Sequence, residues 1–217
     1  MTYKFLIPLL LSGVFAACIK DETPMPNYRQ ELADISTNAL GVATTLTPSD
    51  AVPCTILNRV ADLRPDTTYR ALTLFTRSAN EVWLTDFAPV LVPVPSKYTG
   101  QSVRHDALSV VAAWAEPNYV NLRLNIKGTA QGRHYFGMKI VETTTHADQK
   151  RTLRLKLIHD QNNDPLYYSR DMYLSLSLAR LRQQLQAGRD SVSVSIHTFK
   201  GETQLHVSVV ILLNFAL

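Results

Sequence analysis

The histidines and carboxylates of this chain are the side chains best suited to acid–base or metal chemistry, and they are dispersed. The six histidines are His105, His134, His146, His159, His197 and His206. None of their spacings places two ring nitrogens on one face of a helix or strand, and the neighbours His159 and Asp160 would point to opposite faces of a strand. Locally hydrogen-bonded or solvated histidines are therefore predicted, with convergence in space left open.

One acidic segment partly fits the template of a calcium-binding loop. The residues at template positions 1, 3, 5 and 12 are Asp160, Asn162, Asp164 and Asp171. Pro165 stands where the template needs glycine, and the flanking sequence alternates as strands do rather than as helices do. A polar turn between two strands explains the segment better, so no metal site is expected.

Motifs for nucleophilic or cofactor chemistry are absent from the sequence. It contains no Gly-x-Ser-x-Gly elbow, no glycine-rich phosphate loop and no dinucleotide fingerprint. Carboxylates that could pair for glycoside cleavage lie in no distinctive sequence context. We therefore expect no catalytic residues and no cofactor; a hydrolase assembled from dispersed His and Asp side chains is a minor alternative.

Three tyrosines beside the polar turn are the candidate binding residues. Tyr167 and Tyr168 follow the turn directly, and Tyr173 lies a short distance after them. Exposed aromatic rings commonly form contact platforms for proteins or carbohydrates. We predict that these tyrosines bind a protein or glycan partner, and packing in the core is the alternative role.

Alternation with a period of two dominates the chain from residue 37 onward and indicates the elements that hold these side chains. Clear runs cover 120–126, 152–157, 192–196 and 205–209. Each run places apolar side chains on one face, as a half-buried strand requires. Lys200-Gly201-Glu202 predicts a hairpin, whereas Leu178, Leu181 and Leu185 recur at helical spacing and predict one short crossover helix. The predicted fold class is all-β with antiparallel sheets.

Composition and charge agree with a packed β protein and exclude several classes. Of the 217 residues, 46% are hydrophobic and 18% are charged, which excludes collagen-like and charge-driven disordered chains. Two cysteines exclude a disulfide framework and a Cys-rich metal site. The net charge of +4 is spread without a basic cluster, so nucleic acid is not an expected partner.

A proline-rich segment, residues 89–95, separates two β-rich regions of different texture. Residues 37–105 are enriched in Thr, Pro and Ala and predict a smaller N-terminal β domain. Residues 106–217 hold longer alternating runs and predict a larger C-terminal sandwich. The apolar end of the chain, Val207–Leu217, is shorter than the ~20 residues of a membrane-spanning helix and predicts a buried terminal strand.

The first 17 residues have the form of an export signal. Lys4 precedes an apolar stretch, Phe5–Phe15, and small residues follow it. Phe15-Ala16-Ala17-Cys18 resembles a bacterial lipobox, which implies cleavage before Cys18 and a lipid on its thiol. Residues 18–36 are then predicted to be a lipidated tether that anchors the protein to a membrane. An ordinary secretory signal is the alternative.

The residues after Cys18 and the second cysteine refine the predicted location. Lys20, Asp21 and Glu22 resemble the tag that directs Bacteroidota lipoproteins to the outer leaflet of the outer membrane. This resemblance implies a cell-surface protein, with a periplasm-facing anchor as the alternative.

Cys54 has no partner in the lipidated chain and lies in an apolar, β-prone stretch, so it is predicted to be a buried, inert thiol.

An ordered series of short segments between about residues 105 and 210 carries a family resemblance. The segments are Trp114, 119–122, 134–136, 155–164, 174–178, 190–192 and 197–202. Together they resemble the NigD-like family of Bacteroidota lipoproteins. The resemblance implies a small N-terminal OB-like β-barrel followed by a C-terminal β-sandwich, and it implies no established activity and no catalytic residues.

The function expected from these observations is that of a non-catalytic outer-membrane lipoprotein that binds a protein or glycan partner at the cell envelope. The bacteriocin-associated gene cluster that gave the resembled family its name supplies an alternative, an accessory or immunity protein. OB-like folds serve many unrelated functions, so the fold does not choose between these roles.

Overall fold

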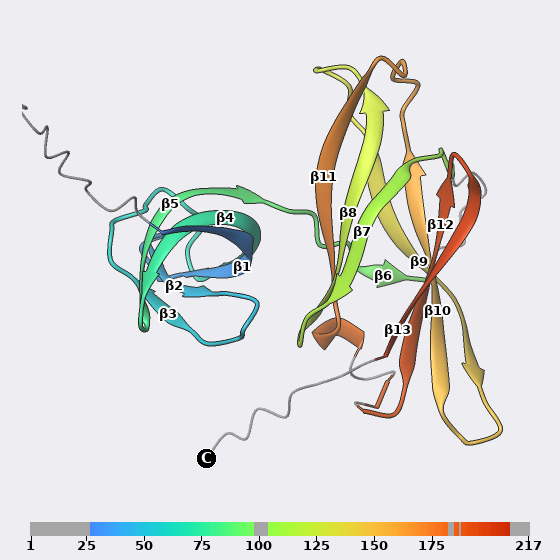
Figure 1. Cartoon of the computed structure of the whole chain (residues 1–217), viewed down its shortest axis with the longest axis horizontal. Coiled ribbons are helices and arrows are strands. Elements are labelled where there is room, and N and C mark those ends of the chain that lie inside the picture. Colours follow the sequence, from blue (N-terminus) through green and yellow to red (C-terminus); the bar gives the residue numbers. More distant parts are fainter. Residues whose placement is uncertain (1–26, 98–103, 182–184, 187, 209–217) are drawn as a thin grey trace, which may run out of the picture.

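The computed structural model describes residues 27–97, 104–181, 185–186 and 188–208, which fold into a β-barrel and a β-sandwich (Figure 1). Each domain has its own buried apolar cluster, so the described residues form two cores. The all-β fold class and its barrel-plus-sandwich architecture are confirmed.

The N-terminal domain is a closed barrel of five strands. The strands are β1 (Tyr28–Thr37), β2 (Ala43–Thr47), β3 (Cys54–Ile56), β4 (Thr68–Ser78) and β5 (Glu81–Pro89). Their order around the barrel is β1-β2-β3-β5-β4, with β3 and β5 parallel, which is the arrangement of an OB-like barrel. Ile35, Leu46 and Phe75 are fully buried at its centre. Closure leaves no unpaired edge in this domain.

Part of the predicted tether belongs to this barrel. Residues 28–36 form most of β1, which pairs with both β2 and β4. The reason lies in Leu32, Ala33 and Ile35, which are buried and give this stretch an apolar inner face. The chain between Cys18 and the barrel is therefore shorter than the sequence analysis expected.

The C-terminal domain is a sandwich of a five-stranded and a three-stranded sheet. Its strands are β6 (Pro95–Ser96), β7 (Ser109–Ala115), β8 (Tyr119–Gly128), β9 (Tyr135–Thr145), β10 (Arg151–Asp160), β11 (Tyr168–Ser177), β12 (Ser191–Thr198) and β13 (Gly201–Ser208). The larger sheet has the order β13-β12-β10-β9-β6 and the smaller has the order β11-β8-β7. Alternate residues of β8 and β10, such as Leu124 and Leu155, pack between the two sheets.

Several sequence expectations can be compared with this sandwich. The predicted hairpin is confirmed, since β12 and β13 pair across a turn that ends at Gly201, whose φ is +110°. β10 and β12 are parallel rather than antiparallel, because the intervening β11 crosses to the other sheet and reverses the chain twice. Of the predicted crossover helix, the described residues show only a 3-10 turn, η1 (Ala179–Leu181), and residues 182–184 and 187 lie outside the described residues.

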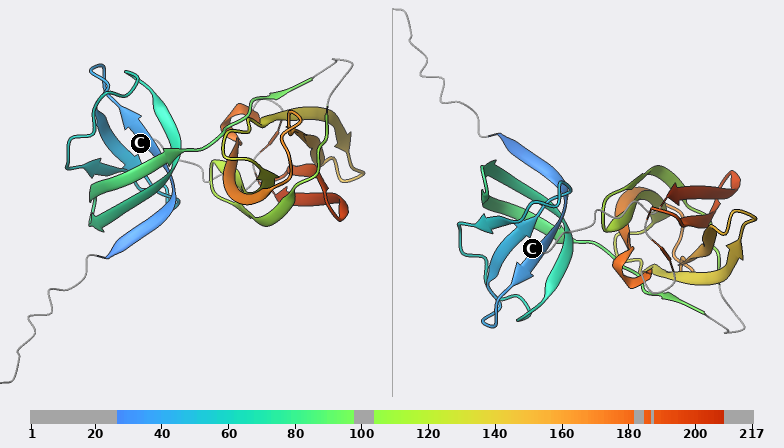
Figure 2. Two further views of the ribbon diagram at one scale, coloured as in Figure 1. Left: turned by 90° about the horizontal axis from the view of Figure 1, so that it is seen from above. Right: turned by 90° about the horizontal axis from the view of Figure 1, so that it is seen from below.

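The connection between the domains is the proline-rich segment. β5 ends at Pro89, and Leu91 then bridges to Leu174 on β11 before β6 joins the edge of the larger sheet beside β9. The sandwich therefore begins before the predicted boundary at residue 105, because Pro95 and Ser96 already pair within it. Figure 2 shows the two domains side by side, joined by this segment.

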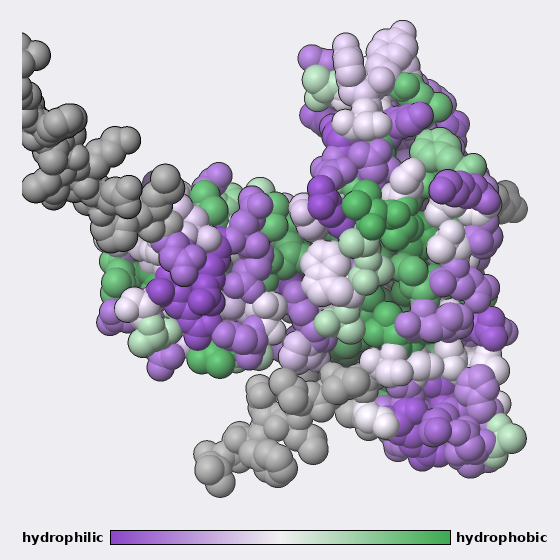
Figure 3. Space-filling model, viewed as in Figure 1, coloured by the Kyte–Doolittle hydropathy of each residue, from purple (hydrophilic) through white to green (hydrophobic). Residues whose placement is uncertain are grey.

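Hydrophilic and apolar side chains are unevenly distributed on the visible surface. Figure 3 shows strongly hydrophilic side chains on the barrel and at the lower end of the sandwich, whereas apolar side chains gather over the middle of the sandwich. The edge strand β7 contributes to the sandwich surface through Val111, which is 49% exposed. The described part of the chain contains no helix with the length and apolar character that a membrane span requires.

Candidate functional site

The three tyrosines predicted to form one platform lie in two places. Tyr167 and Tyr168 are 74% and 67% exposed, and their rings meet edge to face with centroids 6.4 Å apart. They lie where the chain enters β11, at the upper end of the sandwich in Figure 1. Tyr173 lies further along β11, is half-buried and lines a cleft between the barrel and the sandwich. The structure thus separates Tyr173 from the other two.

Two more exposed apolar side chains lie at the same end of the sandwich. Tyr135, the first residue of β9, is 58% exposed, and Leu166 is 51% exposed. We call Tyr135, Leu166, Tyr167 and Tyr168 the aromatic tip. Large rings with few rotatable bonds supply contact area at a low cost in conformational entropy, which suits them to binding another macromolecule.

A chain of hydrogen bonds lies beneath the aromatic tip and joins the two loops that carry it. His134 Nδ1 lies 2.9 Å from His159 Nε2, and His134 Nε2 lies 3.1 Å from Asp164 Oδ2. At the other end of the chain, His159 Nδ1 lies 2.9 Å from the carbonyl oxygen of Asp106. The His159 ring also stacks on Phe136 at a centroid distance of 4.7 Å. The β8–β9 and β10–β11 loops are thereby fixed to each other.

Asp164 is the anchor of this chain. Its carboxylate accepts hydrogen bonds from the backbone N–H and the hydroxyl of Thr129, at 2.8 and 2.7 Å. The carboxylate also lies against Gly128 and Gly132, where a Cβ atom would come within 2.3 and 1.8 Å of Asp164 Oδ2. Glycine is required at both positions because Asp164 occupies the space that a side chain would need.

The group at one end of the hydrogen-bond chain fixes the position of one proton. Asp106 supplies a carbonyl that can only accept, so His159 donates to it from Nδ1. The His134 ring bridges His159 Nε2 and the Asp164 carboxylate. Hydrogen bonds from Thr129 lower the pKa of Asp164, and burial lowers the pKa of His159, which agrees with an ionised Asp164 and a neutral His159.

A second buried polar network joins the barrel to the sandwich. Arg70 on β4 is almost fully buried and forms ion pairs with Asp34 of the barrel, at 3.4 Å, and with Glu116, which follows β7. Its guanidinium also donates to Asn121 Oδ1, at 3.3 Å, and to Ser175 Oγ, at 3.4 Å. One barrel side chain is thus bonded to three segments of the sandwich.

Tyr119 completes the contact between the domains. Its ring lies 4.1 Å from the Arg70 guanidinium carbon, and its hydroxyl donates to Asp34 Oδ2 at 3.2 Å. Burial and the neighbouring Asp34 carboxylate raise the pKa of Tyr119 to about 12, so the phenol keeps its proton. Burial also raises the pKa of Asp34, although the charge of Arg70 opposes this effect. Through these bonds Arg70, Asp34, Glu116 and Tyr119 form a lock between the domains.

The interdomain cleft lies beside this lock and has a volume of about 510 Å³. Its walls are β1 and β4 of the barrel and β7 and β11 of the sandwich. The side chains around it include Gln30, Glu31, Leu72, Trp114, Glu116 and Tyr173. Ligand sites commonly have volumes of ~300–1,000 Å³ and often occur where two domains meet. The predicted binding residue Tyr173 therefore lies in a second candidate site.

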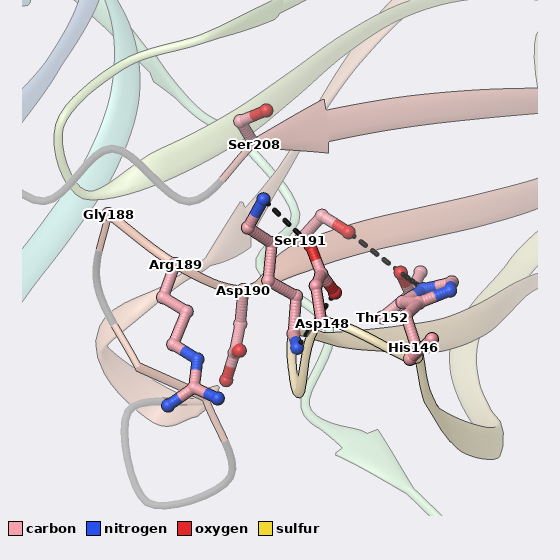
Figure 4. Close-up of a pocket in the computed structure, with 10 residues that line it drawn as sticks. His146, Asp148, Thr152, Gly188, Arg189, Asp190, Ser191 and Ser208 are labelled. Atoms are coloured by element: carbon pink, nitrogen blue, oxygen red, sulfur yellow. Dashed lines mark hydrogen bonds and ion pairs between the residues drawn. The ribbon is translucent and has the colours of Figure 1, made fainter.

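A larger polar cavity, of about 680 Å³, lies at the opposite end of the sandwich from the aromatic tip (Figure 4). Its polar side chains bond to one another: His146 Nε2 lies 2.8 Å from Thr152 Oγ1, and Thr152 Oγ1 lies 2.9 Å from Ser191 Oγ. Asp190 is 2% exposed and accepts hydrogen bonds from the backbone and guanidinium of Arg151. These bonds tie the turn before β12 to β10, which is a structural role.

The calcium-template residues do not share a site. Asp164 is bonded to Thr129 and His134, whereas Asp171 on β11 accepts from Asn125 at 2.8 Å and pairs with Arg123. Across the described ranges, no group of three or more His, Cys, Asp or Glu side chains is arranged to hold a metal ion.

The remaining predicted residues are placed as follows. Cys54 is 1% exposed in the barrel core, as predicted for a buried thiol. Cys18, Lys20, Asp21 and Glu22 lie outside the described residues, as does most of the apolar segment Val207–Leu217.

Sequence reasoning missed both polar networks. Pairing of β9 with β10 places Phe136 opposite His159, and this register brings His134 to the same end of the sheet. The alternating pattern of β9 and β10 indicated two strands joined by a turn. The spacing of the histidines along the chain did not show which residues of the two strands lie opposite each other. Arg70 and Glu116 come from different domains, and nothing in the sequence links them.

Comparison with known proteins finds solved structures with a similar fold. No curated protein matches the chain. Solved structures similar to it include a NigD-like immunity protein from Bacteroides caccae, with 22% identity and a TM-score of 0.65 over 83% of this chain and 92% of that chain. Another, from Parabacteroides distasonis and described as toxin-related, has 16% identity and a TM-score of 0.65 over 84% and 94% of the two chains. A third, from Bacteroides fragilis and described as a lipoprotein, has 10% identity and a TM-score of 0.58 over 84% and 99%.

These similarities establish the shared fold, and the family follows from the sequence. Residues 90–209, more than half of the chain, match the family model of the NigD-like C-terminal beta sandwich domain. The matched range begins directly after β5 and covers the described strands of the sandwich, from β6 to β13. The resemblance stated from the sequence is therefore confirmed, and the chain belongs to the NigD-like family.

Proposed function

We propose that this protein is a non-enzymatic, lipid-anchored outer-membrane protein that binds a partner protein through its aromatic tip. The observation that carries the proposal is the exposure of Tyr135, Leu166, Tyr167 and Tyr168 at one end of the sandwich. Loops at the end of a sandwich are a common place for recognition, because the sheets hold them while their sequences vary.

The hydrogen-bond chain beneath the tip supports this role. A surface that is already ordered before binding loses less conformational entropy when its partner arrives. The chain from Asp106 through His159 and His134 to Asp164 holds both loops without using any atom of the exposed rings. The protruding rings offer area for a protein surface, whereas the interdomain cleft offers a recess for a smaller ligand.

The anchor part of the proposal rests on Cys18 and the residues that follow it. If Cys18 carries the lipid, nine residues, 19–27, separate it from β1. A flexible segment of this length has a root-mean-square reach of about 15–18 Å. The barrel would then lie close to the membrane, and Lys20, Asp21 and Glu22 would act as the signal for display on the cell surface.

In vivo photo-crosslinking tests the tip. A photoreactive amino acid replaces Tyr167 in the full-length protein, and its matched control replaces Tyr28, which is 53% exposed on the barrel. We expect a discrete crosslinked protein from position 167 that is absent from position 28 and is reduced at least fivefold when Y168A is added. Identical patterns from both positions, or none from 167 in a correctly anchored protein, would overturn the proposed tip.

Immunity to a toxin is the second candidate function. It is favoured by the structural neighbour from Bacteroides caccae, which is named as a NigD-like immunity protein. Under this candidate the partner at the tip is the toxin itself, and cells that lack the gene should be more sensitive to it. Identical killing curves with and without the gene would remove this candidate and leave the crosslinking result unaffected.

A further inference from the structure

The interdomain cleft has aromatic walls that the proposed tip function does not use. Trp114 on β7 and Tyr173 on β11 are half-buried and both line it. In the register of the smaller sheet, Trp114 pairs with Asn121 of β8 and Tyr173 pairs with Arg123. With strands ~4.8 Å apart and a rise of ~3.4 Å per residue, the two positions are about 12 Å apart. A ligand that touches both is therefore longer than a single sugar-sized ring.

The indole of Trp114 is fixed before any ligand arrives. Its Nε1 donates to Glu116 Oε1 at 3.1 Å, and the other carboxylate oxygen of Glu116 accepts from Arg70. Arg70 is in turn held by Asp34 on the barrel and by Asn121 on β8. The orientation of this aromatic wall thus depends on the lock between the domains, and a preorganised wall lowers the entropic cost of binding.

The barrel wall of the cleft supplies hydrogen-bonding groups. Glu31 accepts from the hydroxyl of Ser49 at 2.5 Å and from its backbone N–H at 3.3 Å, which fixes the carboxylate. Each carboxylate oxygen has two lone pairs, so Glu31 retains capacity for further donors. Gln30, next to it on β1, is exposed and adds an amide that both donates and accepts.

The charge of the cleft selects the class of ligand. No Lys, Arg or His is among the described residues that line the cleft, and Arg123, opposite Tyr173 on β8, is already paired with Asp171. Glu116 is paired with Arg70, which it shares with Asp34, whereas Glu31 has no cationic partner among the residues that line the cleft. Aromatic faces combined with carboxylate and amide acceptors suit a ligand that is uncharged and rich in hydroxyl groups.

We propose that the interdomain cleft binds a neutral oligosaccharide of at least two units. Trp114 and Tyr173 stack against the sugar rings, and Glu31 and Gln30 accept hydrogen bonds from their hydroxyl groups. This site is separate from the aromatic tip, so the protein has one surface for a partner protein and one cleft for a glycan. The inference does not depend on the proposed function of the tip.

Tryptophan fluorescence gives a direct test, because the chain has only two tryptophans, Trp83 and Trp114. Trp83 is 56% exposed on the barrel, so W83F leaves Trp114 as the single reporter with little effect on folding. The full-length W83F protein in detergent is titrated with neutral glucan, mannan, galactan and xylan oligosaccharides, and with sulfated and uronate-containing glycans of matched length. We expect a saturable change in emission with at least one neutral oligosaccharide and none with the anionic set.

Variants of the cleft then locate the binding. Y173A and E31Q should each weaken the neutral glycan at least tenfold, whereas the matched tip variant Y167A should leave its affinity within twofold. Thermal unfolding of each variant shows that a loss of binding is not a loss of fold. The proposal is overturned if the folded protein binds no neutral oligosaccharide, if it prefers an anionic glycan or a basic peptide, or if Y167A weakens the glycan as much as Y173A does. A failure of the tip proposal would leave these titrations unchanged.

Discussion

At the scale of single residues, the protonation of the hydrogen-bond chain is the feature with the clearest chemical consequences. His159 is neutral and buried, and burial lowers its pKa below the ordinary value of 6.5. An unfolded chain would bind a proton there at a higher pH than the folded one does. The contribution of neutral His159 to the free energy of unfolding is therefore fully present above about pH 6.5. It is lost as the pH falls through the lower pKa of the folded state.

We therefore expect the free energy of unfolding to fall between about pH 7 and pH 5, and part of this slope to vanish in H159Q. H206Q, at an exposed position on β13, is the matched control and should keep the slope. Burial also lowers the pKa of His105, so H159Q reduces the slope without abolishing it. Urea unfolding at several pH values measures the effect, and equal slopes in wild type and H159Q would contradict it.

At the scale of elements, the β8–β9 loop depends on the absence of a side chain at Gly132. A Cβ atom there would lie 1.8 Å from Asp164 Oδ2, and Asp164 cannot move away because Thr129 and His134 hold it. At Gly137 on β9 the nearest atom to an added Cβ is Ile158 Cδ1, at 3.6 Å, which is an ordinary contact.

G132A should therefore destabilise the protein by about 1–3 kcal/mol, as overpacking usually does. G137A should change stability by less than about 1 kcal/mol in either direction, because a strand glycine gains backbone order when it is replaced by alanine. Hydrogen exchange of the two loops would show whether the loss in G132A is local to the tip. Similar stabilities of the two variants would refute the proposed role of the glycine contact.

Among the features of the molecule, the strands were predicted best from the sequence. Alternation in stretches such as 120–126 and 152–157 identified β8 and β10, since each strand has one face in the core. The same reasoning left residues 28–36 in the tether, because the inward side chains of β1 include the small Ala33 beside polar neighbours. It could not reveal that His134 and His159 meet, or that Tyr173 faces a cleft, because strand register and domain packing are set by contacts between distant residues.

At the scale of the whole molecule, Arg70 determines how firmly the domains are joined. R70M removes the guanidinium but leaves Asp34 and Glu116 behind in a largely buried setting. Breaking a buried ion pair in this way costs about 3–5 kcal/mol, whereas an exposed pair contributes about 0–1 kcal/mol. R123M, which breaks the exposed pair with Asp171, is the matched control.

Calorimetry of these two variants tests the lock. We expect R70M to lower the Tm and to separate the unfolding of the barrel from that of the sandwich, while R123M unfolds like the wild type. R70K keeps the charge but loses the planar fork, so it should restore only part of the loss. Unfolding of R70M at the wild-type temperature would show that the domains are held together by other contacts.

The same network limits how freely the two domains can recombine with domains of other proteins during evolution. The guanidinium belongs to the barrel, whereas Glu116, Asn121 and Ser175 belong to the sandwich. A barrel grafted onto a foreign sandwich would bring a buried cation with three of its four hydrogen-bond partners missing, and a sandwich grafted onto a foreign barrel would bring an orphaned carboxylate. The two domains are therefore expected to be inherited as one piece, although each has a core of its own.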